Sequence, residues 1–91
     1  MRKLSEKVRS KCEKVDLDPE CLKIDEYRAG NIVQIYCSYQ HLGRQLAVGF
    51  ELDRLHVENY RGDLIELRIL MALEEMKSFI DNVKAGSQAM P

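Results

Sequence analysis

The sequence predicts a two-layer α+β domain in the order αβββα, with two helices covering one face of a three-stranded antiparallel meander. Apolar residues recur at helical spacing near both ends of the chain and alternate with polar residues through its middle. A glycine-containing turn separates the two longest alternating segments. Because helices and sheets each have one apolar side to bury, the two layers can cover each other.

Length and composition indicate a single globular domain. The chain has 91 residues, of which 45% are hydrophobic and 32% are charged, with two prolines. Such a composition is typical neither of a disordered chain nor of a membrane-spanning one. We expect residues 1–86 to form the domain and residues 87–91 to form a flexible tail.

The N-terminus and the cysteines predict a cytoplasmic protein without a membrane role. The stretch MRKLSEKVRSKCEK lacks the apolar segment of a secretory signal. Three cysteines, at positions 12, 21 and 37, make a poor disulfide framework, so we expect reduced thiols. The cysteines and the two histidines also lack the paired spacing of a zinc site, and we expect neither metal nor cofactor.

The first helix is expected over residues 3–15. Its apolar residues are spaced by four, four and three positions, which gives one narrow stripe: Leu4, Val8, Cys12 and Val15. Pro19 ends it, because proline cannot continue a helix and disfavours helical geometry at Asp18.

Residues 21–28, 31–40 and 44–53 alternate with the period of strands. Folding the last two about Leu42 and Gly43 gives an inner face on which every pair is apolar, and a slip of one residue would destroy it. The predicted inner pairs are Tyr39 with Leu46, Cys37 with Val48, Ile35 with Phe50, and Val33 with Leu52. On the outer face this register sets Tyr36 opposite Gly49, where the ring can cover the glycine backbone.

Residues 53–60 are ambiguous. Leu55 and Val57 alternate with polar residues. Two interpretations stay open: the third strand continues past a bulge, or a short fourth strand follows.

The tripeptide Arg61-Gly62-Asp63 matches a cell-adhesion signal, but its position favours a helix cap. Asp63 directly precedes a long apolar pattern, and Glu66 follows three residues later, which is the spacing of a capping box. We therefore expect Asp63 to cap a helix over residues 64–85, which Gly86 ends.

This last helix has two apolar surfaces. We expect a broad stripe to form the core: Ile65, Ile69, Ala72, Leu73, Met76, Phe79, Ile80 and Val83. A second patch lies away from that stripe: Leu64, Leu67, Leu70 and Met71. Either the N-terminal helix covers this patch, or it is exposed and contacts a partner.

The N-terminal helix is basic, although the chain as a whole is nearly neutral. Residues 1–14 carry six basic and two acidic side chains, whereas the net charge of the whole chain is −1. The basic residues are Arg2, Lys3, Lys7, Arg9, Lys11 and Lys14. They form either a solvated face or a phosphate-binding surface, although a pI near 6.1 is low for a nucleic-acid-binding domain.

No catalytic arrangement is indicated, because neither His41 nor His56 belongs to a recognisable nucleophile or acid–base motif.

We expect a non-enzymatic protein that binds another protein, as an adaptor, regulator or inhibitor, with a homodimer as one form of such contact. The expected binding residues are Leu64, Leu67, Leu70, Met71, Ile32 and Tyr36. The alternative is nucleic-acid binding through the basic helix, or base stacking on Tyr27 and Tyr36.

Overall fold

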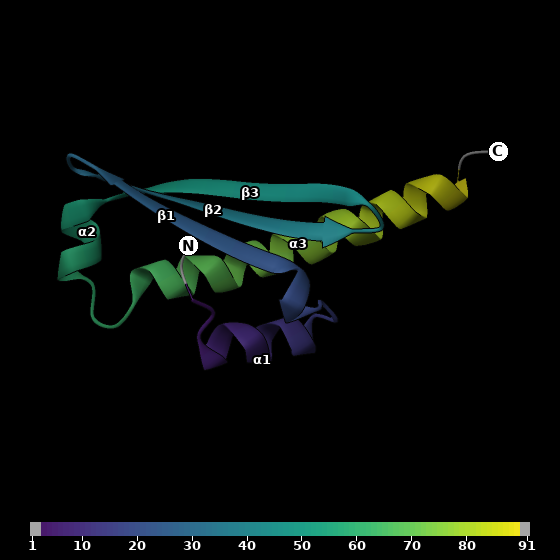
Figure 1. Ribbon diagram of the computed structural model, residues 1–91, viewed down its shortest axis with the longest axis horizontal. Helices are drawn as coiled ribbons and strands as arrows, with labels where there is room; N and C mark the ends of the chain where they lie inside the picture. The colour runs from purple at the N-terminus through teal and green to yellow at the C-terminus, as the bar shows by residue number, and fades with distance from the viewer. Residues whose placement is uncertain (1–2, 90–91) are drawn as a thin grey trace.

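The computed structural model describes residues 3–89, with side chains described as far as residue 82. The molecule is elongated, with extents of 50 × 25 × 20 Å. Its elements are α1 (Glu6–Lys14), a single 3-10 turn η1 (Pro19–Cys21), β1 (Leu22–Ala29), β2 (Ile32–His41), β3 (Arg44–Asp53), α2 (Arg54–Asn59) and α3 (Leu64–Ala89) (Figure 1).

The three strands form an antiparallel sheet in the order β1-β2-β3. The predicted register of β2 against β3 is confirmed at every inner pair, from Tyr39 opposite Leu46 to Val33 opposite Leu52. A two-residue turn joins these strands, with positive φ at Leu42 (51°) and Gly43 (77°). Two positive φ values are typical of the type I′ turn, whose twist matches that of the flanking strands.

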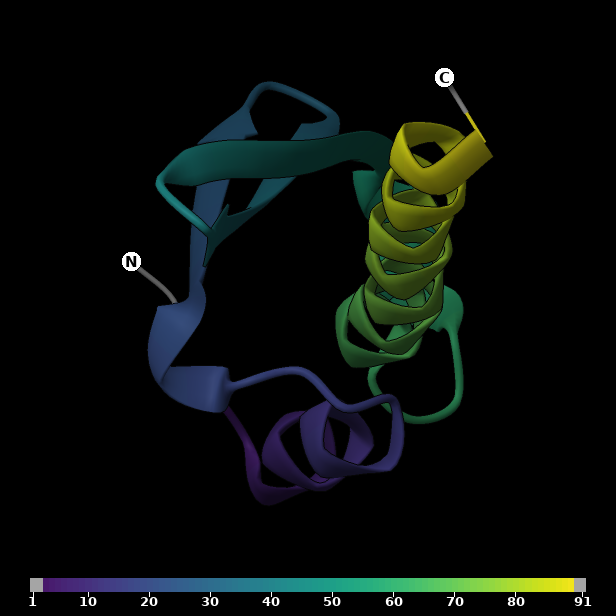
Figure 2. The same ribbon diagram turned by 90° about the vertical axis from the view of Figure 1, so that its right-hand side faces the viewer.

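Both long helices lie on one face of the sheet, so the predicted α+β class and layer order are confirmed. Seen along the molecule, the strands, α3 and α1 surround a common interior (Figure 2). One hydrophobic cluster fills this interior and draws on α1, all three strands and α3. The most deeply buried large side chains are Ile24, Ile35, Ile69, Leu73, Met76 and Val33.

Residues 54–59 form the short helix α2, so both strand interpretations of this segment were wrong. The Asp53 carboxylate caps the helix by accepting a hydrogen bond from the Leu55 amide at 2.8 Å. Arg54 and Glu58, one turn apart, form an ion pair that also stabilises the helix, with 3.1 Å between Nε and Oε1. Capping and the ion pair outweighed the period-two alternation of apolar residues.

The last helix is longer than predicted. It continues through Gly86 to Ala89, so residues 87–89, expected in a flexible tail, are helical, and residues 90–91 lie outside the described residues. Glycine inside a helix costs about 1 kcal/mol relative to alanine, which good helix formers on either side can offset. The C-terminal part of α3 extends beyond the ends of the strands (Figure 1).

Phe79 is not a core residue, which corrects the expected stripe on α3. Its side chain is 54% exposed, whereas the neighbouring Ile80 is buried. Phe79 lies at the margin of the stripe and shares a small hollow with Leu46 and Arg44, close to the turn between β2 and β3. The side chain of Val83 lies outside the described residues.

Candidate protein-binding surfaces

An aromatic patch lies on the outer face of the sheet, which no described element covers. Tyr27, Ile32 and Tyr36 are 56%, 44% and 43% exposed, respectively. Tyr27 lies opposite Gln34, which places it between the two β2 residues, and its ring meets the Tyr36 ring edge to face at 5.8 Å between centroids. We call Tyr27, Ile32 and Tyr36 the outer patch.

A glycine on the neighbouring strand makes room for the Tyr36 ring. Tyr36 lies opposite Gly49, as predicted, and a Cβ placed on Gly49 would be only 3.0 Å from Cδ1 of the tyrosine. The ring therefore rests on bare backbone on one side and against Tyr27 on the other. Such packing restricts the side chain before any partner binds.

Three carboxylates border the outer patch. Each of its three cross-strand rows ends in one: Asp25 beside Tyr36, Glu51 beside Gln34, and Asp53 beside Ile32. Lysine and arginine are absent from these rows of the described sheet. Lys23 is exposed on the same face in the row beyond Asp25, so the charge around the patch is mixed but negative in sum. The rim therefore favours cationic groups over phosphates.

Sequence reasoning assigned Ile32 and Tyr36 to protein binding and Tyr27 only to base stacking. The structure brings all three together. The signal that identifies Tyr27 is the register of β1, because Tyr27 lies opposite Gln34, the residue between Ile32 and Tyr36 on β2.

The patch expected on α3 is divided between the interior and solvent. Leu64 and Leu70 are half-buried and pack against the core, whereas Leu67 and Met71 are 40% and 56% exposed. This patch is also remote from the outer patch, because α3 covers the inner face of the sheet (Figure 2). The predicted binding residues therefore form two separate surfaces.

Polar contacts between α1 and α3 explain why part of the α3 patch is covered. The Ser5 hydroxyl donates to the Glu66 carboxylate at 2.9 Å, and Lys11 forms an ion pair with Glu74. They hold α1 beside α3, and the half-buried Leu70 shares a hollow with side chains of α1.

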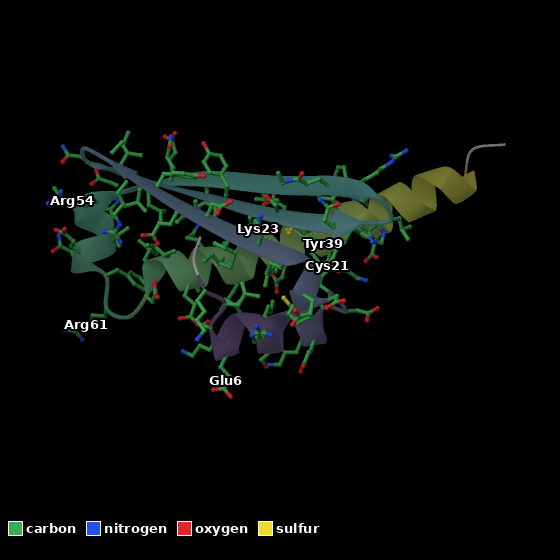
Figure 3. The ribbon with its side chains drawn as sticks, viewed as in Figure 1. Glu6, Cys21, Lys23, Tyr39, Arg54 and Arg61 are labelled. Atoms are coloured by element: carbon green, nitrogen blue, oxygen red, sulfur yellow. The ribbon has the colours of Figure 1, made fainter. Side chains whose placement is uncertain are left out.

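The basic face of α1 is partly neutralised. Lys11 is paired with Glu74, and Arg9 lies 3.6 Å from Glu20. Lys3, Lys7 and Lys14 are exposed, while Arg2 lies outside the described residues. Lys7 and Lys14 line a hollow of about 210 Å³ together with Ser10, Lys11 and Leu70. Glu6 and Glu13 interrupt the basic residues, and Glu6 points away from the sheet (Figure 3).

The Arg61-Gly62-Asp63 segment caps α3, as predicted. The Asp63 carboxylate accepts a hydrogen bond from the Glu66 amide at 3.0 Å. Gly62 adopts a φ of 101°, which only glycine adopts readily. The Arg61 side chain points away from the body of the protein (Figure 3). The aspartate therefore has a structural task at the first turn of α3.

The cysteines offer little reactivity. Cys12 and Cys37 are fully buried, and burial raises the pKa of the Cys37 thiol to about 11 and raises that of Cys12 as well. Because the thiolate is the reactive form, both are poor nucleophiles. Cys21 is half-buried beside Asp18. Lys23 follows two residues later, at the start of β1 (Figure 3). No group of three potential metal ligands converges within the described residues.

Comparison of the chain with protein-family models, curated proteins and solved structures finds no significant match. Within the described residues, none of the helices combines the length and the apolar character needed to cross a membrane. The fold and its exposed surfaces therefore carry the functional argument.

Proposed function

We propose that this chain is a non-catalytic module that binds another protein on the outer patch. The observation that carries the proposal is the exposure of two packed tyrosines and an isoleucine on an uncovered sheet face. Tyrosine is enriched at binding hot spots because a large, rigid ring loses little conformational entropy on contact.

The rim of the outer patch indicates the charge of the partner. Asp25, Glu51 and Asp53 border the rings, so a partner with lysine or arginine around an apolar centre would match the surface. We propose that a non-catalytic binding protein of this size acts as an adaptor, regulator or inhibitor. Three free cysteines support placing the contact in the cytoplasm, where thiols stay reduced.

The surface of α3 is a secondary candidate. Leu67 and Met71 are exposed. Their neighbour Leu70 already lies beside side chains of α1. This leaves a smaller apolar area than the outer patch, and we assign it a supporting role.

Nucleic-acid binding through α1 is the alternative, and the hollow between Lys7 and Lys14 favours it. The ion pairs of Lys11 and Arg9 weaken it, because those cations already have partners. Phosphate binding should weaken steeply between low and physiological salt, whereas an apolar contact should change little. Reversing the charge at Lys7 and Arg9 should abolish nucleic-acid binding and leave binding on the outer patch intact.

A photocrosslinking experiment tests the proposed surface. A benzophenone amino acid at position 27 probes the outer patch, and the same residue at position 42, where Leu42 is 87% exposed at the far turn, is the matched control. In nuclease-treated lysate of the source cell, we expect a discrete protein adduct at position 27 and none at position 42. Equal labelling at both positions, or labelling at position 42 alone, would contradict the proposal.

A further inference from the structure

The edge of β3 presents unpaired backbone groups. β3 is the last strand of the sheet and pairs only with β2 among the described strands. The two-residue turn makes His41 and Arg44 a hydrogen-bonded pair, and such pairs alternate along an antiparallel ladder. The inner-face residues of β3 therefore bond to β2, and the N–H and C=O groups of Gln45, Ala47, Gly49 and Glu51 point outward.

This edge lacks the features that usually prevent strand pairing. From Gln45 to Phe50 the strand has no charge and no proline. The opposite edge, β1, carries four charged residues: Lys23, Asp25, Glu26 and Arg28. Natural sheets protect a free edge with charges, proline or bulges, so β1 is protected and the centre of β3 is open to pairing.

An apolar row runs beside the open edge. Leu46, Val48 and Phe50 point to the inner face but are only half-buried. Phe79 of α3 is exposed and lines a hollow of about 100 Å³ together with Leu46. The Arg68 guanidinium covers part of this row, since it lies 5.0 Å from the centroid of the Phe50 ring. The rest of the row is only partly covered, and an added strand would bring further apolar side chains to it.

We infer that two copies of this chain pair antiparallel along β3 and form a continuous six-stranded sheet. A two-fold axis at Val48 sets this residue opposite itself, Leu46 opposite Phe50, and Ala47 opposite Gly49. The inner pairs are then all apolar at the centre, and the outward backbone groups of Ala47 and Gly49 bond to those of the second copy.

The charges at the ends of β3 select the same partner and direction. In this register Arg44 of one strand lies opposite Leu52 of the other, between Glu51 and Asp53. The Arg44 side chain is on the inner face and the two carboxylates are on the outer face, so the strand ends attract each other without a direct side-chain pair. Parallel in-register pairing would instead bring like charges together. The strand is thus complementary to itself, which selects a second copy over an unrelated strand.

The dimer does not depend on the outer patch, but it would duplicate it. An antiparallel two-fold keeps the outer faces of both copies on the same side of the sheet, so Tyr27, Ile32 and Tyr36 would occur twice on one surface. If the proposed function holds, such a surface would bind a repeated or two-fold partner with increased avidity.

Sedimentation equilibrium with a proline variant tests the dimer. Ala47→Pro removes an N–H that points away from β2, so the ladder with β2 is kept while pairing with a second copy is blocked. Ala47→Ser keeps the N–H and is the matched control. From about 10 μM to about 1 mM, where weak dimers form, we expect wild type and Ala47→Ser to approach twice the chain mass of 10.6 kDa. Ala47→Pro should remain monomeric with an unchanged circular dichroism spectrum.

Hydrogen exchange provides the second measurement and does not need a variant. The amides of Gln45, Ala47, Gly49 and Glu51 should gain at least about tenfold protection at the higher concentration, where the dimer predominates. A wild-type monomer throughout this range would overturn the inference, as would a dimer that persists in Ala47→Pro or that is lost in Leu67→Lys. Tyr27→Ser should lose the protein partner but remain dimeric, which separates failure of the proposed function from failure of the dimer.

Discussion

Ser5 and Glu66 join the first turns of the two long helices. The Ser5 hydroxyl accepts a hydrogen bond from the Val8 amide at 3.3 Å, as the N-cap of α1, and donates to Glu66 of α3 at 2.9 Å. Glu66 in turn donates its amide to the cap residue Asp63. The two helix caps are therefore coupled across 61 residues of sequence, which fixes the position of α1 on α3.

Replacing Ser5 should test this coupling. Ser5→Ala removes the cap of α1 and leaves the Glu66 carboxylate without one hydrogen-bond donor, so we expect a loss of about 1 to 2 kcal/mol in the free energy of unfolding. Ser10→Ala, on the exposed side of the same helix, is the control and should change it by less than about 0.5 kcal/mol. Urea unfolding measures both, and equal stabilities of the two variants would refute the coupling.

Asp63 should contribute to stability rather than to adhesion. Asp63→Ala removes the acceptor for the Glu66 amide and should lower the free energy of unfolding by about 1 kcal/mol. Asp63→Ser keeps an oxygen that can cap the helix, so its free energy of unfolding should fall much less. Thermal unfolding compares the three proteins, and equal melting temperatures for wild type and Asp63→Ala would exclude the capping role.

The features that sequence predicted are those set by local chemistry. The cap at Asp63 and the turn at Leu42 and Gly43 depend on neighbouring residues, and one apolar face was enough to fix the register of β2 against β3. The α2 segment was missed because alternation and a single helical turn are hard to distinguish over six residues.

The outer patch and the open edge of β3 are less visible in sequence because both depend on the placement of other elements. Phe79 matches the core stripe by spacing, but it lies at the margin of the stripe, near the turn between β2 and β3, and is exposed. Leu67 and Leu70 are both leucines of the same helix, yet Leu70 is half-buried beside side chains of α1 and Leu67 is exposed. Tyr27 joins the patch through pairing with a strand that follows it in the chain.

The contact between Tyr36 and Gly49 can be measured by a double-mutant cycle. A Cβ on Gly49 would meet the ring at 3.0 Å, so Gly49→Ala should displace Tyr36 and lower the stability of the wild-type protein. In a Tyr36→Ala background the clash is gone, and the same substitution should stabilise the strand by about 0.5 to 1 kcal/mol, since alanine loses less backbone entropy than glycine. An identical effect of Gly49→Ala in both backgrounds would show that the ring does not rest on the glycine.

Cys37 should make the protein less stable in alkaline solution. Burial raises the pKa of its thiol from 9.0 to about 11, so between these values the folded state keeps a proton that the unfolded state has lost. The unfolded state then binds fewer protons, and the free energy of unfolding should fall as the pH rises from about 9, by at most about 1.4 kcal/mol per pH unit, and level off above about pH 11. Cys37→Ala removes this contribution and leaves all other residues unchanged. We therefore expect the difference in the free energy of unfolding between wild type and Cys37→Ala to be constant from pH 7 to 8.5. Above pH 9 the wild type should lose stability relative to Cys37→Ala. Urea unfolding under reducing conditions measures both. Parallel curves over the whole range would mean that the Cys37 thiol titrates alike in the folded and unfolded states.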